Sequence, residues 1–369
     1  MTHLPSVSLP PISLAATSTG CRRCEQLPPP LQGPGTIYLK FPLAHSRSKI
    51  LSYLSASGLQ LEQQNDILSI HAPDADLASL LSPLRAVLSS IEQADVRVLF
   101  QPKGCELQLA DCFEVEPLNG FLARSQSRWL LDLMSQNRLT SWFQPIVSCE
   151  KPSHVFAYEC LMRGLEADGE TVFPAQILEV ARGAGLLFQL DRAARLAAIR
   201  CAAQHQLSTR IFINFMPTAI YDPINCLKST VKAVDEVGIA RERVVFEVIE
   251  SDLVRDVSHL KNILDYYRGN GFSVALDDVG AGYSNLNLLA QLRPDYIKLD
   301  MQMTRGVDAD PYKATVARKL LETAREIGVT TIAEGIETKE ELQWLCEHGA
   351  DYVQGYFFAK PAPIPPLLQ

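Results

Sequence analysis

Several features that mark particular classes of protein are missing from this sequence of 369 residues. No apolar run is long enough to cross a bilayer, so we expect no membrane partner. Basic residues are not in excess, since the net charge is −8, and this argues against nonspecific binding of duplex nucleic acid. There is no internal repeat and no long block of like charge. The composition is that of an ordinary globular protein, with 47% hydrophobic and 21% charged residues.

The beginning of the chain lacks the basic n-region of a signal peptide and is interrupted by prolines. We therefore expect residues 1–35, including the Pro-rich stretch Gln26–Gly35, to be a flexible tail and linker. The chain has nine cysteines and no signal peptide, which favours a reducing, cytoplasmic setting. Because the number is odd, we expect that these cysteines are not all paired in disulfides.

A small α+β domain is predicted over residues 36–117. Its apolar patterns and turn residues predict six elements in the order βαββαβ, which is the order of a ferredoxin-like sandwich. The expected strands are 36–41, 59–63, 66–72 and 96–102. The expected helices are 45–58 and 74–91, the second bent at Pro83.

Four cysteines flank this small domain in sequence. Cys21 and Cys24 form a CxxC before its first strand, and Cys105 and Cys112 follow its last strand. In a ferredoxin-like sheet these two strands are antiparallel neighbours, so the four thiols would converge at one edge. A structural zinc site, a redox dithiol at Cys21 and Cys24, and four unrelated cysteines are the three interpretations of this spacing.

A second domain is predicted over residues 118–369. A long amphipathic helix over 122–139 is followed by eight apolar strands with helical stretches between most of them. Eight strands alternating with helices over this length favour a TIM-like (β/α)₈ barrel.

Polar side chains recur near the ends of the predicted barrel strands. A strand-end Asp taken alone is more often a helix N-cap, but capping does not explain a polar group on seven strands in turn. The carboxyl ends of all barrel strands meet at one face, where active sites lie. These residues are Glu159, Asn214, Glu247 with Glu250, Asp277 with Asp278, Lys298 with Asp300, Glu334 with Glu337, and Gln354.

So many carboxylates at one face require a counter-charge, because their mutual repulsion would raise several pKa values. The donors are oxygens, with Asn214 adding a carbonyl, and this set favours Mg²⁺ or Mn²⁺ over zinc. The adjacent aspartates Asp277 and Asp278 suit two metal ions roughly 3.5–4 Å apart, the arrangement used in phosphodiester hydrolysis.

The loop after these aspartates raises a competing interpretation. Gly280 and Gly282 invite comparison with a dinucleotide-binding loop. That motif needs a third glycine where Asn285 stands, and two carboxylates would face the pyrophosphate. We therefore interpret the glycines as flexibility for a loop that closes the site.

The motifs of the second domain, taken together, resemble those of the EAL-type cyclic di-GMP phosphodiesterases. "ECLMR", which begins at Glu159, is similar to the signature EALxR, with Cys160 in place of Ala. "LDDVGAGYSNL" is similar to DDFGTGYSSL, with Val279 for Phe and Ala281 for Thr. "FEVIE" has Ile249 where the family has Thr. "QPIV", "INFMP", "YIKLD", "IAEGIE" and "VQGYFFAKP" complete the series in the family's order.

The resemblance implies a role for each matching residue. Two Mg²⁺ or Mn²⁺ ions would be held by Glu159, Asn214, Glu247, Asp277, Asp278 and Glu334. Lys298, Glu334, Asp278 and Gln354 would act in catalysis, with Lys298 near the attacking water. Gln144, Arg163, Met216, Pro217 and Tyr283 would bind substrate, and Glu250, Gly280 and Gly282 would support the loop. The family also implies a homodimer formed through the barrel.

The expected function is therefore hydrolysis of cyclic di-GMP to linear pGpG, under control of the N-terminal domain. One alternative is a catalytically silent cyclic di-GMP receptor, since Ile249 and Val279 change residues that support the ligands. Another is an unrelated Mg²⁺-dependent barrel enzyme that uses Lys298 as a base. Synthesis of the nucleotide is not predicted, because no Gly-Gly-(Asp/Glu)-Glu-Phe run occurs in the front half.

Overall fold

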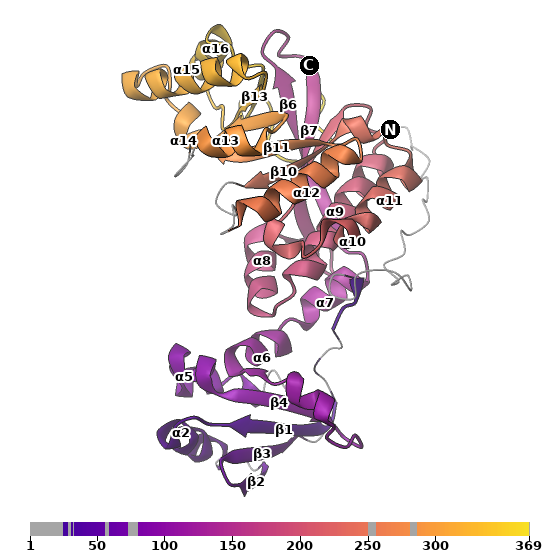
Figure 1. Ribbon diagram of the computed structural model, residues 1–369, viewed down its shortest axis with the longest axis vertical. Coiled ribbons are helices and arrows are strands. Elements are labelled where there is room, and N and C mark those ends of the chain that lie inside the picture. The colour runs from indigo at the N-terminus through magenta and orange to yellow at the C-terminus, as the bar shows by residue number, and fades with distance from the viewer. Residues whose placement is uncertain are drawn as a thin grey trace. The chain divides into compact units, whose positions relative to one another are not determined.

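A computed structural model describes residues 25–28, 31, 33–55, 59–72, 80–249, 256–280 and 286–368. The chain separates into two compact units (Figure 1). The front unit comprises Leu27–Gln136 and Val172–Leu187, and the barrel unit comprises Asn137–Thr171 and the chain from Phe188 onward. The predicted boundary between residues 117 and 118 stays a prediction.

The front unit contains a five-stranded sheet and several short helices. Its strands are β1 (Gly35–Lys40), β2 (Gln60–Gln64), β3 (Ile67–Ala72), β4 (Arg97–Pro102) and β5 (Glu116–Pro117). Its helices are α2 (Ala44–Leu54), α4 (Leu84–Val87), α5 (Ser90–Asp95), the 3₁₀ turn η1 (Leu109–Phe113), α6 (Leu118–Ser125), α7 (Arg128–Ser135) and α8 (Pro174–Gly183).

The strand order of this sheet is β2-β3-β1-β4-β5, and the strand pairs are antiparallel. The first four strands have the order of the predicted ferredoxin-like sandwich, which is thereby confirmed, and β5 extends its edge. Alternate residues of β1 face the apolar core, where Ile37 and Leu39 are fully buried with Ile50 and Leu54 of α2.

Two predicted helices are each divided in the structure. Within the described part of 74–91, α4 ends at Val87, and Ser89 then caps α5 with its side chain in a capping box with Glu92. The predicted helix over 122–139 is likewise replaced by α6 and α7, because the backbone leaves helical geometry at Ser127.

The barrel unit alternates strands with helices. Its strands are β6 (Leu139–Ser148), β7 (Val155–Leu165), β8 (Thr171–Val172), β9 (Arg210–Asn214), β10 (Val244–Ile249), β11 (Ser273–Val279), β12 (Tyr296–Leu299), β13 (Thr330–Ala333) and β14 (Tyr352–Gln354). Its helices are α9 (Leu187–Gln204), α10 (Pro223–Cys226), α11 (Lys228–Val237), α12 (Val257–Gly269), α13 (Leu286–Leu292), α14 (Met301–Thr304), α15 (Pro311–Glu326) and α16 (Lys339–Glu347), with 3₁₀ turns at η2 (Pro217–Ala219) and η3 (Arg241–Arg243).

These strands close into the predicted TIM-like barrel. The sheet runs β6-β14-β13-β12-β11-β10-β9-β7-β8, and a further pairing of β6 with β7 closes the ring. β6 differs from an ordinary barrel strand, because it is antiparallel to both β7 and β14. The connection from Ser148 to Val155 is too short for the crossover that parallel strands need, so the two strands form a hairpin.

An apolar layer fills the barrel interior. It contains one residue from each of seven strands, namely Ile146, Ala157, Phe212, Val245, Ala275, Tyr296 and Ile332. Residues of a strand alternate between its two faces, so the side chains two positions further along also point inward. This alternation places the next inward-facing residue of each strand directly above this apolar layer, which we call the apolar floor.

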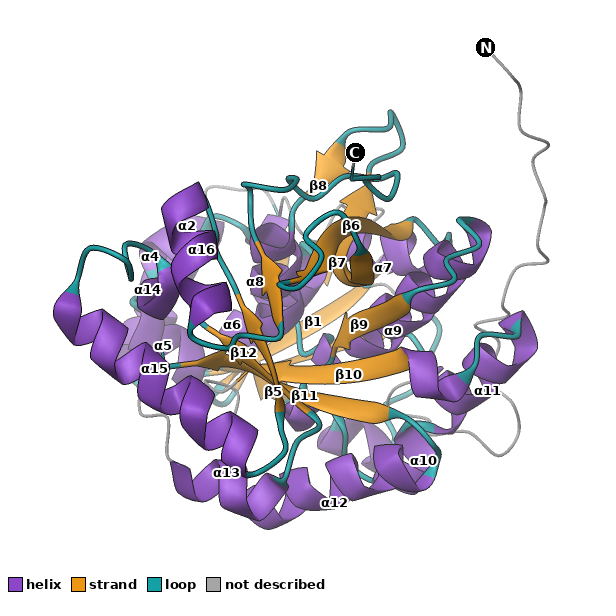
Figure 2. Cartoon of the chain, turned by 90° about the horizontal axis from the view of Figure 1, so that it is seen from above, coloured by secondary structure: helices purple, strands orange, loops and turns teal. Residues whose placement is uncertain are grey.

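The opposite faces of the strands form a larger core beneath the helices. Figure 2 shows α9, α12, α13 and α15 outside the strands. Strand residues such as Phe246 and Val274 pack there against helix residues such as Leu260 and Tyr267. No helix in the described part of the chain combines the length and the apolar character that crossing a bilayer requires.

One disulfide, between Cys149 and Cys346, joins two distant parts of the barrel unit. Cys149 follows β6, and its N–H donates to the carbonyl of Asp351, just before β14. The bridge therefore lies at the end of β14 away from Gln354. Five described cysteines are free, among them Cys105 and Cys112, which agrees with the expectation that the cysteines are not all paired.

The disulfide is expected to stabilise the barrel, because it links residues 197 positions apart and so restricts the unfolded chain. Replacing Cys346 by Ser should lower the free energy of unfolding by about 2–4 kcal/mol in urea titrations under oxidising conditions. The exposed Cys112→Ser is the matched control. Identical unfolding midpoints for the wild type with and without dithiothreitol would contradict the prediction.

Glu92 should make the stability of the front unit depend on pH. The backbone N–H of Ser89, then Lys49 and Ser46, lower the pKa of Glu92 from 4.5 to about 2. A carboxylate whose pKa is lowered by folding stabilises the fold above its unfolded pKa, and this contribution is lost as the pH falls through its folded pKa. Glu92→Gln should thus lower the melting temperature at pH 7, with a difference that shrinks towards pH 2. The exposed Glu106→Gln should leave it unchanged, and an undiminished Glu92→Gln difference at pH 2 would refute this assignment.

Candidate active site

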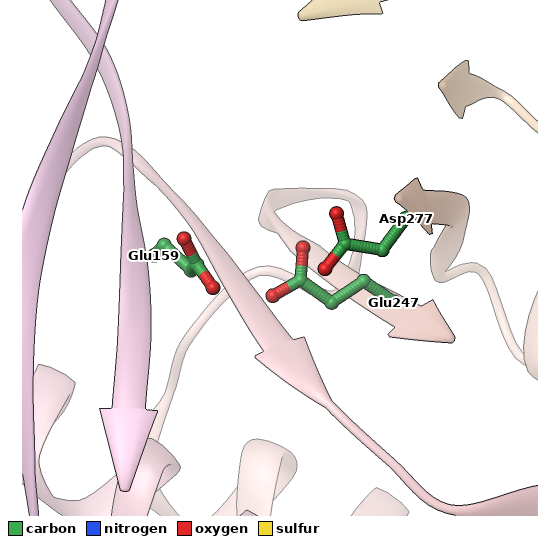
Figure 3. Close-up of side chains that lie close together, drawn as sticks. All are labelled: Glu159, Glu247 and Asp277. Carbon is green, nitrogen blue, oxygen red and sulfur yellow. The ribbon is translucent and has the colours of Figure 1, made fainter. Parts of the chain in front are cut away.

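The inward-facing residues just above the apolar floor are polar, and they converge. Each lies two positions from a floor residue or from Tyr352, which packs against that floor. Figure 3 shows the carboxylates of Glu159, Glu247 and Asp277 turned towards one another. Their oxygens lie within 4.8 Å of each other, and a second group with the same spacing contains Asp277, Asp278 and Glu334.

Lys298 of β12 stands at the centre of this cluster and is fully buried. Its Nζ lies 2.7 Å from Glu334, 3.2 Å from Glu247, 3.3 Å from Asp277 and 3.4 Å from Glu159. The structure therefore brings the predicted lysine into contact with four of the predicted carboxylates, which lie on β7, β10 and β11 and directly after β13.

Two amide side chains orient the carboxylates. Asn214 Nδ2 donates to Glu247 at 2.7 Å and to Glu159 at 3.3 Å. Gln354 Nε2 donates to Glu159 at 2.6 Å and to Gln144 at 3.1 Å. The buried Oε1 of Gln354 accepts no hydrogen bond from the described residues and so remains available to a ligand. The buried Oε2 of Glu247 also accepts none, but it is paired with the Lys298 ammonium at 3.2 Å.

The charges of the cluster do not balance. Burial raises the pKa of Glu247 and Glu334 well above the usual range, although Lys298 opposes the shift. Burial also raises the pKa of Asp277, and burial together with Asp277 raises the pKa of Asp278 to about 6. Burial alone would lower the pKa of Lys298, but the surrounding carboxylates hold it well above its usual range. One ammonium cannot neutralise so many carboxylates, so the site favours additional cations.

A β-bulge explains how two consecutive aspartates reach one site. Neighbouring residues of a regular strand point to opposite faces. The register between β11 and β12 shifts between Leu276 and Val279, and Asp278 has a left-handed φ of 56°. This local turn brings Asp278 to the same site as Asp277, whose Oδ1 accepts the Asp278 N–H at 2.9 Å.

The other predicted site residues are placed as follows. Arg163, four positions after Glu159 on β7, is buried and lies over the Trp142 ring at 4.9 Å. Met216 and Pro217 lie two and three residues after Asn214, and Pro217 begins the 3₁₀ turn η2. Gly280 has a φ of 103°, and a Cβ there would lie 2.6 Å from Cγ of Met303, so this position requires glycine. Glu250, Gly282 and Tyr283, like Cys21 and Cys24, lie outside the described residues.

A buried ion pair that was not predicted from the sequence lies behind the site. Asp191 and Arg195 are one turn apart on α9, almost fully buried, with their charged atoms 2.8 Å apart. Asp191 accepts the backbone N–H of Met216 at 2.8 Å, two residues after Asn214. An Asp and an Arg four positions apart in an otherwise Ala- and Leu-rich helix, "LDRAARLAA", are the sequence feature that would have revealed it.

This ion pair also connects to the strand that carries Glu247. Arg195 donates to Thr230 at 3.1 Å and to the Tyr267 hydroxyl at 3.5 Å. The Tyr267 ring stacks on Phe246 with centroids 3.9 Å apart, and Phe246 directly precedes Glu247. Asp191 and Arg195 are therefore positioning residues for two strand ends.

Comparison with protein families agrees with this geometry. The family model described as "EAL domain" matches residues 127–361, which is well over half of the chain. The chain belongs to the EAL domain family. The matched residues 127–361 include the barrel strands and all five carboxylates described above.

Relatives of this EAL domain include named phosphodiesterases. The probable cyclic di-GMP phosphodiesterase PdeG of Escherichia coli (strain K12) is 30% identical over 243 residues, which cover 64% of this chain and 47% of that protein. The chain thus matches less than half the length of this relative, and 30% of the length of the signaling protein YkoW of Bacillus subtilis (strain 168), which is 26% identical over 65% of this chain.

Solved structures share the fold of the EAL domain. A standalone versatile EAL protein from Vibrio cholerae O395, in its c-di-GMP-bound form, is 35% identical with a TM-score of 0.57, over 63% of this chain and 95% of that one.

The Asp191–Arg195 pair is expected to be essential to the packing behind the EAL site. Asp191→Asn leaves the Arg195 charge buried without a carboxylate, so it should lower the free energy of unfolding by about 3–5 kcal/mol. The matched control is Glu236→Gln, which breaks an exposed pair with Lys232, also four residues apart, and should cost less than about 1 kcal/mol. Urea titrations measure both variants. Equal effects of the two substitutions would contradict the assignment.

Proposed function

We propose that the protein is a metal-dependent phosphodiesterase that hydrolyses one phosphodiester bond of cyclic di-GMP to give linear pGpG. The observation that carries this proposal is the convergence of Lys298, Asn214 and five carboxylates above the apolar floor of the barrel. The relatives named as cyclic di-GMP phosphodiesterases support the choice of substrate.

The donors fit divalent cations of the Mg²⁺ or Mn²⁺ class. They are hard oxygen ligands in two groups that share Asp277. Among the described residues, the buried Oε2 of Glu247 is paired only with the Lys298 ammonium, at 3.2 Å, and accepts no hydrogen bond. Glu159, Asn214, Glu247 and Asp277 would hold one ion, and Asp277, Asp278 and Glu334 the other. When bound, such ions lower the pKa of water and offset charge on a phosphoryl group.

The protein side chains have separate tasks in this proposal. Asn214 and Gln354 fix the orientation of Glu159 and Glu247 by donating hydrogen bonds to them. The Lys298 ammonium, which is charged at neutral pH, stabilises negative charge on the attacking water. The free Oε1 of Gln354 would accept a hydrogen bond from that water and so orient it.

Substrate contacts are assigned to residues around this centre. Arg163 and Gln144 would hold the dinucleotide, with Met216, Pro217 and Tyr283 completing its site. Arg163 is suited to phosphate because a guanidinium can donate two parallel hydrogen bonds. Glu250, Gly280 and Gly282 would support the loop after Asp278.

Retention of the ligand set favours an enzyme over a silent receptor. Every carboxylate expected from the family pattern is present, and so is Lys298. Val279 stands where the family pattern has Phe. Its side chain is buried in the core beneath the helices, so this difference does not remove a metal ligand. We further propose a cytoplasmic homodimer formed through the barrel, with the front unit as its regulatory part. In that reducing setting Cys149 and Cys346 would be kept as thiols, and their disulfide would form under oxidising conditions.

The assay that tests this function incubates the purified protein with cyclic di-GMP and either Mg²⁺ or Mn²⁺. We expect pGpG from the wild type and a kcat/KM lowered by about a hundredfold or more in Lys298→Ala and Glu159→Ala, because each loses an electrostatic contact at the reacting group. Lys319→Ala, an exposed lysine on α15, is the control and should retain full activity.

Two results would reject the enzyme. Binding of cyclic di-GMP without pGpG under either metal would establish the receptor instead. Absence of both binding and turnover in a folded protein would reject the substrate as well.

A further inference from the structure

A row of polar side chains crosses the sheet of the front unit. His71 of β3 is in register with Gln60 of β2 on one side and with Thr36 of β1 on the other, and Thr36 is in register with Gln101 of β4. Residues in register on adjacent strands point to the same face. These four side chains therefore lie side by side on one face of the sheet.

This face is opposite the core of the front unit. On β1 the core residues are Ile37 and Leu39, so Thr36 and Tyr38 point the other way. Both of these residues are only partly buried. The row thus lies on the sheet face that the apolar core leaves open.

A pocket of about 640 Å³ lies over this row. Its lining includes Thr36, Tyr38, Gln60, His71 and Gln101, together with the loop from Lys103 to Cys105. The N–H of Lys103 donates to the carbonyl of Pro34 at 2.9 Å, which ties that loop to the start of β1. The volume is within the range of small-molecule sites.

The hydrogen bonds within the pocket leave one buried donor unused. The Tyr38 hydroxyl donates to Gln101 Oε1 at 3.3 Å, and Thr36 Oγ1 lies 3.1 Å from His71 Nδ1. Gln101 is only 9% exposed, yet its Nε2 has no hydrogen-bond partner among the described residues. A buried amide without a partner is unfavourable, so this group is suited to receive an acceptor from a ligand.

The charges of the lining favour an anion. Lys103 is the one Lys or Arg among the described lining residues, and none of these residues is an Asp or a Glu. The carboxylate of Glu62, which is not part of the lining, lies 3.5 Å from Nε2 of His71. Leu59, Ala72 and Pro102 add apolar surface beside the Tyr38 ring. The unused donor of Gln101 therefore belongs to a pocket that also accommodates a compact apolar group.

We propose that this pocket binds a small molecule that carries a carboxylate or phosphate on a compact apolar or aromatic body. The oxyanion accepts hydrogen bonds from Gln101 Nε2 and Lys103, and the apolar body lies against Tyr38. The site is independent of the cyclic di-GMP centre and gives the front unit a ligand of its own.

The test uses the full-length ¹⁵N-labelled protein without cyclic di-GMP or metal, so its outcome does not depend on the proposed hydrolysis. Benzoate represents the carboxylates, phenyl phosphate the phosphates, and benzyl alcohol is the uncharged control. The side-chain amide signals of Gln101, assigned by their loss in Gln101→Met, should shift saturably with one or both anions. Comparison of the two anions identifies which oxyanion the site prefers.

Removal of the exposed Lys103 charge tests the same site without disturbing the sheet. Lys103→Met should weaken binding about tenfold, because it removes a charge-assisted hydrogen bond. The matched control Lys40→Met removes an exposed lysine at the far end of β1 and should bind like the wild type. The proposal is overturned by the absence of a saturable shift with both anions, by an equal shift with benzyl alcohol, or by unchanged affinity of Lys103→Met.

Discussion

The concentration of negative charge around Lys298 is the constraint on which the barrel unit depends. Four carboxylates contact one ammonium in the barrel interior, and Asp278 adds a fifth beside them. Burial weakens solvation of each charge, so the arrangement is stable only if partners hold it in place. The amides of Asn214 and Gln354 supply part of that support, and divalent cations would supply the rest.

The surrounding fold keeps this cluster in position. The alternation of strand residues places every ligand except Asp278 two positions from an apolar floor residue, so packing below determines the spacing of charges above. The bulge at Asp278 is the local departure that lets two consecutive residues share the site. Behind the strands, the Asp191–Arg195 pair connects the backbone after Asn214 to the helix that packs on β10.

Much of this site was predictable, because a carboxylate, amide or amine recurs near the end of each successive apolar strand in the sequence. This recurrence predicted both the barrel and the face at which the polar side chains meet. The direction of β6 was missed, although the short connection to Val155 was a sufficient indication. The Cys149–Cys346 disulfide and the contact of Asp191 with Met216 join residues far apart in sequence, so no local pattern specified them. Likewise, the polar row of the front unit depends on strand register.

Anomalous diffraction from crystals of the protein with Mn²⁺ and cyclic di-GMP tests the central claim most directly. The account predicts two manganese peaks, one among Glu159, Asn214, Glu247 and Asp277 and the other among Asp277, Asp278 and Glu334, with a phosphate of the nucleotide beside them. Nucleotide bound in the barrel with no manganese peak at these carboxylates would contradict it.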